Sequence, residues 1–265
     1  MSLAAYVNGI GVLGPGLNGW PDTAAVLCEQ RAYSSAATVL PSPTMLPAAE
    51  RRRTGRVVKV ALGVALQATA AAAADVTQLP SVFSSSGSDG HICHEICQAL
   101  ALPAREVSPT RFSNSVHNAP AGYWSIATGA MTEANVLCAF DASFAAGLLD
   151  AMTQVTADRR DVLLVAYDTE YPPPLHAKRP ISDAFGIALV LSPDLSPQSL
   201  ARLEVALTQE TFDTMRQPQL EAMRASIPAA RGLPLLELLA LQGAGRTIIE
   251  YLDIARVAVQ VEPCR

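Results

Sequence analysis

The sequence has few charged and few aromatic residues. Asp, Glu, Lys and Arg make up 16% of its 265 residues and Phe, Trp and Tyr make up 5%, whereas half of the chain is hydrophobic. Charged residues are about 25% of an average soluble domain, so we expect a partner to cover part of the surface. A net charge of −5 and a single short basic run, Arg51–Arg53, argue against binding to nucleic-acid phosphates. The length and hydrophobic content suit one domain, residues 1–265, with a substantial core.

The sequence also lacks a long uninterrupted apolar run. The longest apolar segment, Val57–Ala74, contains Lys59, Gln67 and Thr69, and its alanine content suits a buried helix better than a membrane span. The first residues, MSLAAYVNGIGVLGPG, have no charged region and break on glycine, so we expect no secretory signal. The odd number of cysteines has no framework spacing, which indicates reduced thiols and a cytoplasmic location. The cysteines are Cys28, Cys93, Cys97, Cys138 and Cys264.

Apolar periodicity predicts strands that alternate with helices through the middle of the chain. The expected strands are Ala4–Asn8, Ser81–Ser86, Ala134–Phe140, Asp161–Tyr167, Phe185–Ser192, Leu203–Thr208 and Ala255–Val261. The expected helices are Asp22–Gln30, Gly55–Ala74, His91–Leu100, Ala119–Thr128, Ser143–Val155 and a Leu-rich helix within Pro228–Cys264. This alternation favours an α/β layered fold with a central sheet.

Three glycines near the N-terminus, Gly9, Gly11 and Gly14, have the spacing of a dinucleotide-binding fingerprint. That fingerprint requires a helix to begin at the last glycine, where its free amides meet the pyrophosphate. Here the residues PGLNGWP follow instead, and no acidic strand end comes about 20 residues later. We therefore interpret the glycines as a turn and expect no cofactor.

Residues 91–97, HICHEIC, place several soft metal ligands close together, with His94 and Cys97 on one helical face. Structural zinc usually takes four ligands in paired spacings, and the remaining cysteines and histidines are isolated in the sequence. We therefore expect no metal site and interpret the segment as a partly buried helix face.

Three further residues have reactive side chains. Cys138 lies within the strand predicted at residues 134–140, without a local base, so it is interpreted as an inert core cysteine. Asp141 lies between that strand and the next helix, where a carboxylate would cap free backbone amides. His117 is expected to lie in a loop and to hydrogen-bond to backbone.

Segments spread over residues 4–192 resemble the β-ketoacyl-acyl-carrier-protein synthases. Residues 118–129, NAPAGYWSIATG, are similar to the asparagine and "AAG" helix before the family's active-site cysteine. Counted without gaps from Gly129, the family's "TAC" falls on Ala139-Phe140-Asp141, so Asp141 occupies the position of the nucleophilic cysteine. Further resemblances are found in residues 7–15 (VNGIGVLGP), 50–53 (ERRR), 82–87 (VFSSSG) and 179–191 (RPISDAFGIALVL), the last without the family's "GEGAG" run.

The resemblance implies a thiolase-like α/β fold, with layered helices around a mixed central sheet, that corresponds to the N-terminal half of a ketosynthase. Residues 193–265 are divergent. The two catalytic histidines of the family belong to motifs of its second half, and neither motif occurs here, where the last histidine is His176. The chain thus resembles truncated, chain-length-factor-like subunits of aryl polyene and related pigment clusters.

The resemblance also implies which residues act. Condensation needs a thiolate to carry the acyl group and donors to stabilise an enolate, and Asp141 cannot form a thioester. We therefore expect no catalytic residue, with Cys138 as the runner-up. The strand before the nucleophile is expected at the two-fold of a dimer through Asn135, Val136, Leu137, Cys138, Ala139 and Phe140. The preceding loop is expected to face the partner's acyl tunnel through Phe112, Asn114, Ser115, Val116 and His117.

Three functions remain open at this point. The first is a non-catalytic subunit of fatty-acid or polyketide-type biosynthesis, paired with a complete ketosynthase or with itself, and visited by acyl carrier protein. The second is an active β-ketoacyl synthase or acyltransferase that uses Cys138 or another residue. The third is a stand-alone module that binds acyl carrier protein. No nucleic acid and no membrane span are expected.

Overall fold

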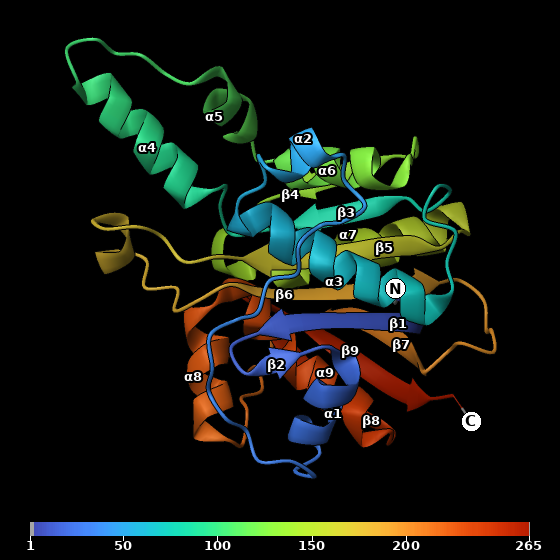
Figure 1. The fold of residues 1–265 in the computed structure, drawn as a ribbon. Helices are drawn as coiled ribbons and strands as arrows, with labels where there is room; N and C mark the ends of the chain where they lie inside the picture. The colour runs from blue at the N-terminus through green and yellow to red at the C-terminus, as the bar shows by residue number, and fades with distance from the viewer. Residues whose placement is uncertain (1–2, 265) are drawn as a thin grey trace.

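The computed structural model describes residues 3–264 and has one extended sheet with helices on both faces (Figure 1). The strands are β1 (Leu3–Gly14), β2 (Leu17–Asn18), β3 (Ser81–Ser84), β4 (Ala134–Leu137), β5 (Val162–Asp168), β6 (Phe185–Ser192), β7 (Ala201–Thr208), β8 (Gly245–Leu252) and β9 (Ala255–Pro263). The α-helices are α1 (Trp20–Leu27), α2 (Ala48–Arg51), α3 (Arg56–Ala72), α4 (Gly90–Ala101), α5 (Pro109–Asn114), α6 (Ala119–Thr128), α7 (Ser143–Asp158), α8 (Pro218–Ser226) and α9 (Leu233–Leu241). Short 3-10 helices are η1 (Phe140–Ala142), η2 (Leu175–Ala177) and η3 (Pro228–Gly232).

The strand order is β4-β3-β5-β6-β1-β7-β9-β8, and β2 pairs with β1. Strand β3 runs parallel to both β4 and β5, while the other neighbours are antiparallel. The sheet is therefore mixed, as predicted. Strand β4 forms one edge of the described sheet and β8 forms the other.

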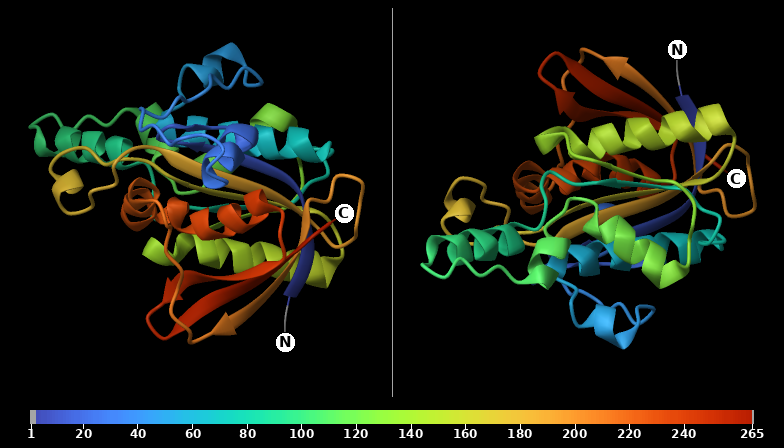
Figure 2. Two further views of the ribbon diagram at one scale, coloured as in Figure 1. Left: turned by 90° about the horizontal axis from the view of Figure 1, so that it is seen from below. Right: turned by 90° about the horizontal axis from the view of Figure 1, so that it is seen from above.

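Helices α3 and α6 cover one face of the sheet, and α1, α7 and α9 cover the other (Figure 2). In β5, Leu163 and Val165 point towards α3, whereas Leu164 and Ala166 point towards α7. Because both faces of this strand are buried, its sequence is continuously apolar instead of alternating. The same holds for β6, whose predicted bounds, Phe185–Ser192, are confirmed.

The N-terminal glycines do not form the predicted turn, because all three lie within β1. A Cβ atom on Gly9 would lie 2.1 Å from the carbonyl oxygen of Ala68, and one on Gly11 would lie 2.0 Å from that of Val64. The glycines thus let α3 approach the strand closely, which turn chemistry alone did not suggest.

Other expectations differ from the structure in their details. Helix α6 has the predicted bounds, but the strand expected to reach Phe140 ends at Leu137. Strand β8 was not predicted. The divergent residues 193–265 supply β7, β8 and β9, which extend the same sheet, and α8 and α9.

Helices α4 and α5 project from the body of the molecule beside the β4 edge (Figure 1). Only Gly90 of α4 is buried, so the expected partly buried face is mostly solvent-accessible. No helix among the described residues is both long and apolar enough to cross a membrane.

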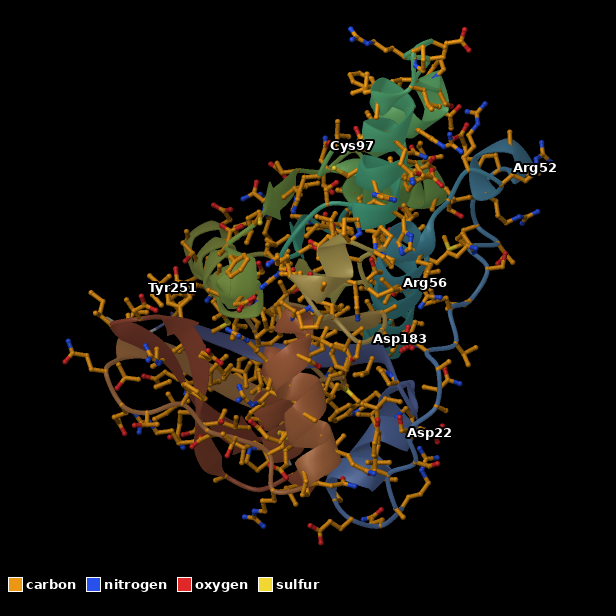
Figure 3. The ribbon with its side chains drawn as sticks, turned by 90° about the vertical axis from the view of Figure 1, so that its left-hand side faces the viewer. Asp22, Arg52, Arg56, Cys97, Asp183 and Tyr251 are labelled. Atoms are coloured by element: carbon orange, nitrogen blue, oxygen red, sulfur yellow. The ribbon has the colours of Figure 1, made fainter. Side chains whose placement is uncertain are left out.

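Asp183, within the segment 179–191, fixes the start of β6 against α3. Its carboxylate accepts hydrogen bonds from the backbone of Thr38 and Ala184, each at 2.7 Å, and pairs with Arg56 at 2.5 Å. Figure 3 shows Arg56 and Asp183 facing each other. The carboxylate therefore joins three segments that are distant in sequence.

We predict that Gly11→Ala destabilises the protein by about 1–3 kcal/mol, because the new methyl group overlaps the α3 backbone. Gly122→Ala is the matched control, since Gly122 is exposed in α6 with no atom near its Cβ position. Alanine there should be neutral or slightly stabilising. Urea unfolding measures both, and equal effects would contradict the close packing of α3 on β1.

Candidate functional site

The chain turns sharply between the end of β4 and the start of α7. Phe140 has a φ angle of +52°, in the left-handed region that non-glycine residues rarely adopt. The hydroxyl of Ser143 accepts from the amide of Ala139 at 3.0 Å and donates to the carbonyl of Phe140 at 2.7 Å. These two bonds hold the backbone on both sides of Phe140, which explains why the strand is shorter than predicted.

Asp141 lies in this turn, but no side chain caps the N-terminus of α7, so the predicted capping role is wrong. Its carboxylate forms ion pairs with Arg179 at 2.5 Å and with Arg231 at 3.1 Å. The Arg179 guanidinium also lies over the Phe140 ring, 3.7 Å from its centroid. The two arginines come from the segment after η2 and from η3, and sequence spacing gave no sign of them.

The ion pairs continue into the C-terminal part of the chain. Arg231 also pairs with Glu250 of β8 at 3.1 Å, and Glu250 pairs with Arg224 of α8 at 3.2 Å. Arg224 is a buried side chain that also binds Glu221 at 2.7 Å. Buried guanidinium groups need such partners to offset their loss of hydration.

Cys138 is exposed, contrary to the core position predicted for it. It lies just beyond the last residue of β4, and its thiol donates to the carbonyl oxygen of Ser86 at 3.3 Å. A nucleophilic cysteine is activated by a base or a cation. The hydrogen-bond partner found here is a carbonyl acceptor, which provides neither.

Asp168, at the end of β5, is a fully buried carboxylate that the sequence did not single out. It accepts from the amide and the hydroxyl of Ser86, at 2.9 and 2.6 Å, and from the amide of Ala229 at 2.8 Å. Burial raises the pKa of Asp168 to about 6, although these hydrogen bonds oppose the rise. The carboxylate ties η3 to the ends of β3 and β5.

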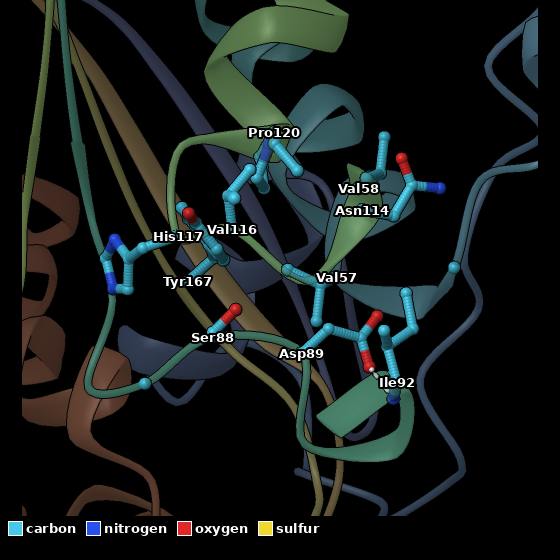
Figure 4. Close-up of a pocket in the computed structure, with 13 residues that line it drawn as sticks. Val57, Val58, Ser88, Asp89, Ile92, Asn114, Val116, His117, Pro120 and Tyr167 are labelled. Atoms are coloured by element: carbon cyan, nitrogen blue, oxygen red, sulfur yellow. Dashed lines mark hydrogen bonds between the residues drawn. The ribbon is translucent and has the colours of Figure 1, made fainter. Parts of the chain in front are cut away.

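The segment predicted to be a loop facing a partner's tunnel is only partly a loop, because Phe112 and Asn114 belong to α5 and the loop begins after them. The segment lies beside a narrow pocket (Figure 4). Asn114, Val116 and His117 line it together with Val57 and Tyr167. Its free volume is about 10 Å³, close to the minimum for one water molecule, so it holds no acyl chain in this conformation.

The other members of this loop point away from the pocket or bond locally. Phe112 is 67% exposed, and Ser115 donates to the carbonyl of Phe112 at 2.8 Å. The Nε2 atom of His117 is buried without a hydrogen-bond partner, so the expected backbone bond is not formed by that nitrogen.

The residues 91–97 do not converge on a metal site. Within residues 3–264, no three His, Cys, Asp or Glu side chains are close enough to hold a metal ion. Cys93 and Cys97 are both exposed on α4. The part of the Cys93 thiol that is shielded from solvent, and then the neighbouring Cys97 thiol, raise the pKa of Cys93.

We predict that Asp141→Asn lowers the free energy of unfolding by about 1–2 kcal/mol, because Arg179 and Arg231 both lose a carboxylate partner in a half-buried site. Asp194→Asn is the matched control. It removes the equally short ion pair of Asp194 with Arg159, which is exposed and should contribute less than about 0.5 kcal/mol. Denaturant unfolding of both variants measures the difference, and equal losses would show that the Asp141 pairs are no stronger than a surface pair.

The raised pKa of Asp168 predicts a pH-dependent contribution to stability. Protonation favours the folded state, so the contribution is complete below the ordinary pKa of about 4 and is lost as the pH rises through about 6. The wild type should therefore exceed Asp168→Asn in unfolding free energy by more at about pH 4.5 than at about pH 7.5. A difference that is the same at both pH values would contradict the raised pKa.

Several solved structures share this fold. A chain of the complex between the ketosynthase ApeO and its chain length factor ApeC, from Xenorhabdus doucetiae, superposes with a TM-score of 0.74 at 23% identity, over 97% of this chain and 99% of that one. A chain of the AntDE:AntF complex, a type II polyketide synthase acyl-carrier protein with its ketosynthase, superposes with a TM-score of 0.77 at 10% identity over the whole of both chains. A β-ketoacyl synthase from Burkholderia phymatum gives 0.67 at 11% identity, again over both whole chains.

At these identities the superpositions establish the fold, and they confirm the thiolase-like arrangement predicted from the sequence. No curated protein sequence matches the chain. A family model described as the N-terminal domain of β-ketoacyl synthase matches residues 26–239, which is most of the chain. The protein therefore belongs to the β-ketoacyl synthase N-terminal domain family.

Proposed function

We propose that this chain is a non-catalytic ketosynthase-like subunit, similar to a chain length factor, that pairs through β4 with a complete β-ketoacyl-acyl-carrier-protein synthase. The observation that carries the proposal is Asp141, a carboxylate held by two arginines at the position aligned with the family's nucleophilic cysteine. The pair would act in cytoplasmic fatty-acid or polyketide-type biosynthesis, of which aryl polyene assembly is one form.

The chemistry of Asp141 argues against condensation by this chain. A carboxylate cannot hold an acyl group as a thioester, and both of its oxygens already face guanidinium groups. A carboxylate would also oppose the negative charge that develops on the enolate. Cys138, the runner-up nucleophile, donates its proton to a carbonyl oxygen and is not paired with a base.

The edge of the sheet at β4 supports pairing. Its outer edge has no partner strand among the described residues, and the run from 134 to 140 contains no charged residue. An uncharged edge without a cover tends to pair with another strand. Val136 and Leu137 are only half-buried in the isolated chain, so a second subunit could complete their burial.

The segment from Phe112, in α5, to Val116, in the loop after it, supports a contribution to the partner's acyl tunnel. Both side chains are exposed, at 67% and 48%, although they are apolar. Helix α5, which contains Phe112 and precedes Val116, projects from the body of the molecule together with α4 (Figure 1). Apolar side chains in such a place could line the wall along which a growing chain extends, and acyl carrier protein would deliver that chain to the complete subunit.

The experiment is co-expression of the chain with a complete ketosynthase encoded beside it, followed by native mass spectrometry. We expect a heterodimer whose interface buries about 2,000 Å² or more. Leu137→Asp should weaken it by about 100-fold or more, because the new charge would be desolvated without a counter-charge. Leu207→Asp is the control, since Leu207 is 63% exposed on β7, far from β4 in the sheet order.

A monomeric chain in the presence of the ketosynthase, unaffected by Leu137→Asp, would refute the pairing. β-Ketoacyl product formed by the chain alone and lost in Cys138→Ser would instead support an active enzyme. Binding of acyl carrier protein without any ketosynthase would support a stand-alone module.

A further inference from the structure

Phe140 combines a strained backbone with an exposed apolar ring. Its φ angle is +52°, and 60% of its surface is accessible to solvent. Neither property stabilises the isolated folded chain, because left-handed backbone is unfavourable for a bulky residue and the ring remains in contact with water. Such strain persists only where the surroundings enforce it, and it is concentrated at functional positions.

The surroundings of Phe140 enforce its position at three points. Ser143 bonds to the backbone on both sides of the residue. Arg179 lies over one face of the ring and leaves the other face to solvent. Arg179 is in turn held by Asp141, which is anchored from the protein side by Arg231, a side chain that is only 11% exposed.

The position of the ring is therefore fixed by a series of contacts that starts at a buried side chain. Arg231 fixes Asp141, Asp141 fixes Arg179, and Arg179 fixes the orientation of Phe140. A side chain that is ordered before association loses little conformational entropy when a partner binds it. Aromatic side chains of this kind often dominate the binding energy of an interface.

We propose that Asp141 is a positioning residue that, through Arg179, presents Phe140 as an anchor for the paired ketosynthase subunit. This inference rests on the proposed pairing through β4, because Phe140 lies three residues beyond the end of that strand. The occupant of the exposed ring face is an apolar pocket on the ketosynthase subunit, next to the strand that pairs with β4. The lack of charge from residue 134 to 140 matches such an apolar surface.

A double-mutant cycle on the affinity of the pair tests the inference. Phe140→Ala should weaken pairing by about 30-fold, and Asp141→Asn should weaken it by about 5- to 10-fold. Because Asp141 acts through Phe140, the double variant should pair no more weakly than Phe140→Ala alone. Leu207→Ala and Asp194→Asn, an exposed apolar residue and an exposed ion-pair residue elsewhere, should pair like the wild type.

Circular dichroism, a conservative variant of Arg179 and a fluorine probe on the ring keep the test independent of folding. Circular dichroism establishes that each variant is folded, and Arg179→Lys, which keeps the charge beside Asp141 but removes the planar group over the ring, should weaken pairing as Asp141→Asn does. 4-Fluorophenylalanine at position 140 reports the ring directly, and its ¹⁹F signal should shift and lose its sensitivity to D₂O when the ketosynthase is added.

The outcomes separate this inference from the proposed function. A heterodimer that forms while the ¹⁹F signal stays unchanged would overturn the anchor and leave the pairing intact. Additive losses for Asp141→Asn and Phe140→Ala would overturn the positioning role of Asp141. Failure of the wild-type chain to pair would overturn the proposed function and this inference together.

Discussion

The ion pairs of Asp141 with Arg179 and Arg231 are the interaction on which the candidate site depends. They connect the turn after β4 with two segments that lie far along the chain, and Arg231 is 90 residues from Asp141. Through Glu250 the same network reaches β8 and α8. Three arginines and three carboxylates alternate along this network, so each charge has a neighbour of opposite sign. In order, the residues are Arg179, Asp141, Arg231, Glu250, Arg224 and Glu221.

Under the proposed function, this arrangement would let a fold used for condensation carry a different role at the same position. The turn between β4 and α7 has an exposed phenyl ring at Phe140, and the neighbouring Asp141 carboxylate is paired with two guanidinium groups. The buried Asp168 holds η3 against the sheet, and η3 carries Arg231. Two carboxylates, Asp141 within the turn and the buried Asp168, thus fix the geometry of one turn.

Much of the fold could be predicted from the sequence because local signals agreed with the tertiary structure. Strand β6 is a continuous apolar run that is buried on both faces, and α6 has Pro120 near its start and Gly129, with a positive φ, at its end. The glycines of β1 misled the prediction because glycine most often marks a turn, whereas here it permits close approach of α3.

The site could be predicted only in part. The gap-free count from Gly129 selected Asp141, but the predicted capping role was wrong because its partners are brought together by tertiary contacts that no local spacing records. Cys138 was predicted to lie in the core because the apolar run from 134 to 140 was interpreted as one strand. In the structure the strand ends at Leu137, one residue before Cys138, and Cys138 is exposed. Asp168 was missed although a carboxylate at the end of an entirely apolar strand is itself a signal, since a buried charge needs dedicated donors.

The most direct test of the account is amide hydrogen exchange along β4. Amides of the strand that point away from β3 have no partner strand within residues 3–264, so they should exchange rapidly in the isolated chain. When the complete ketosynthase is added, these outward-pointing amides within residues 134–137 should become strongly protected while the amides of β8, at the other edge of the sheet, stay unchanged. Unprotected β4 amides in a demonstrated heterodimer would contradict the claim that this edge forms the interface.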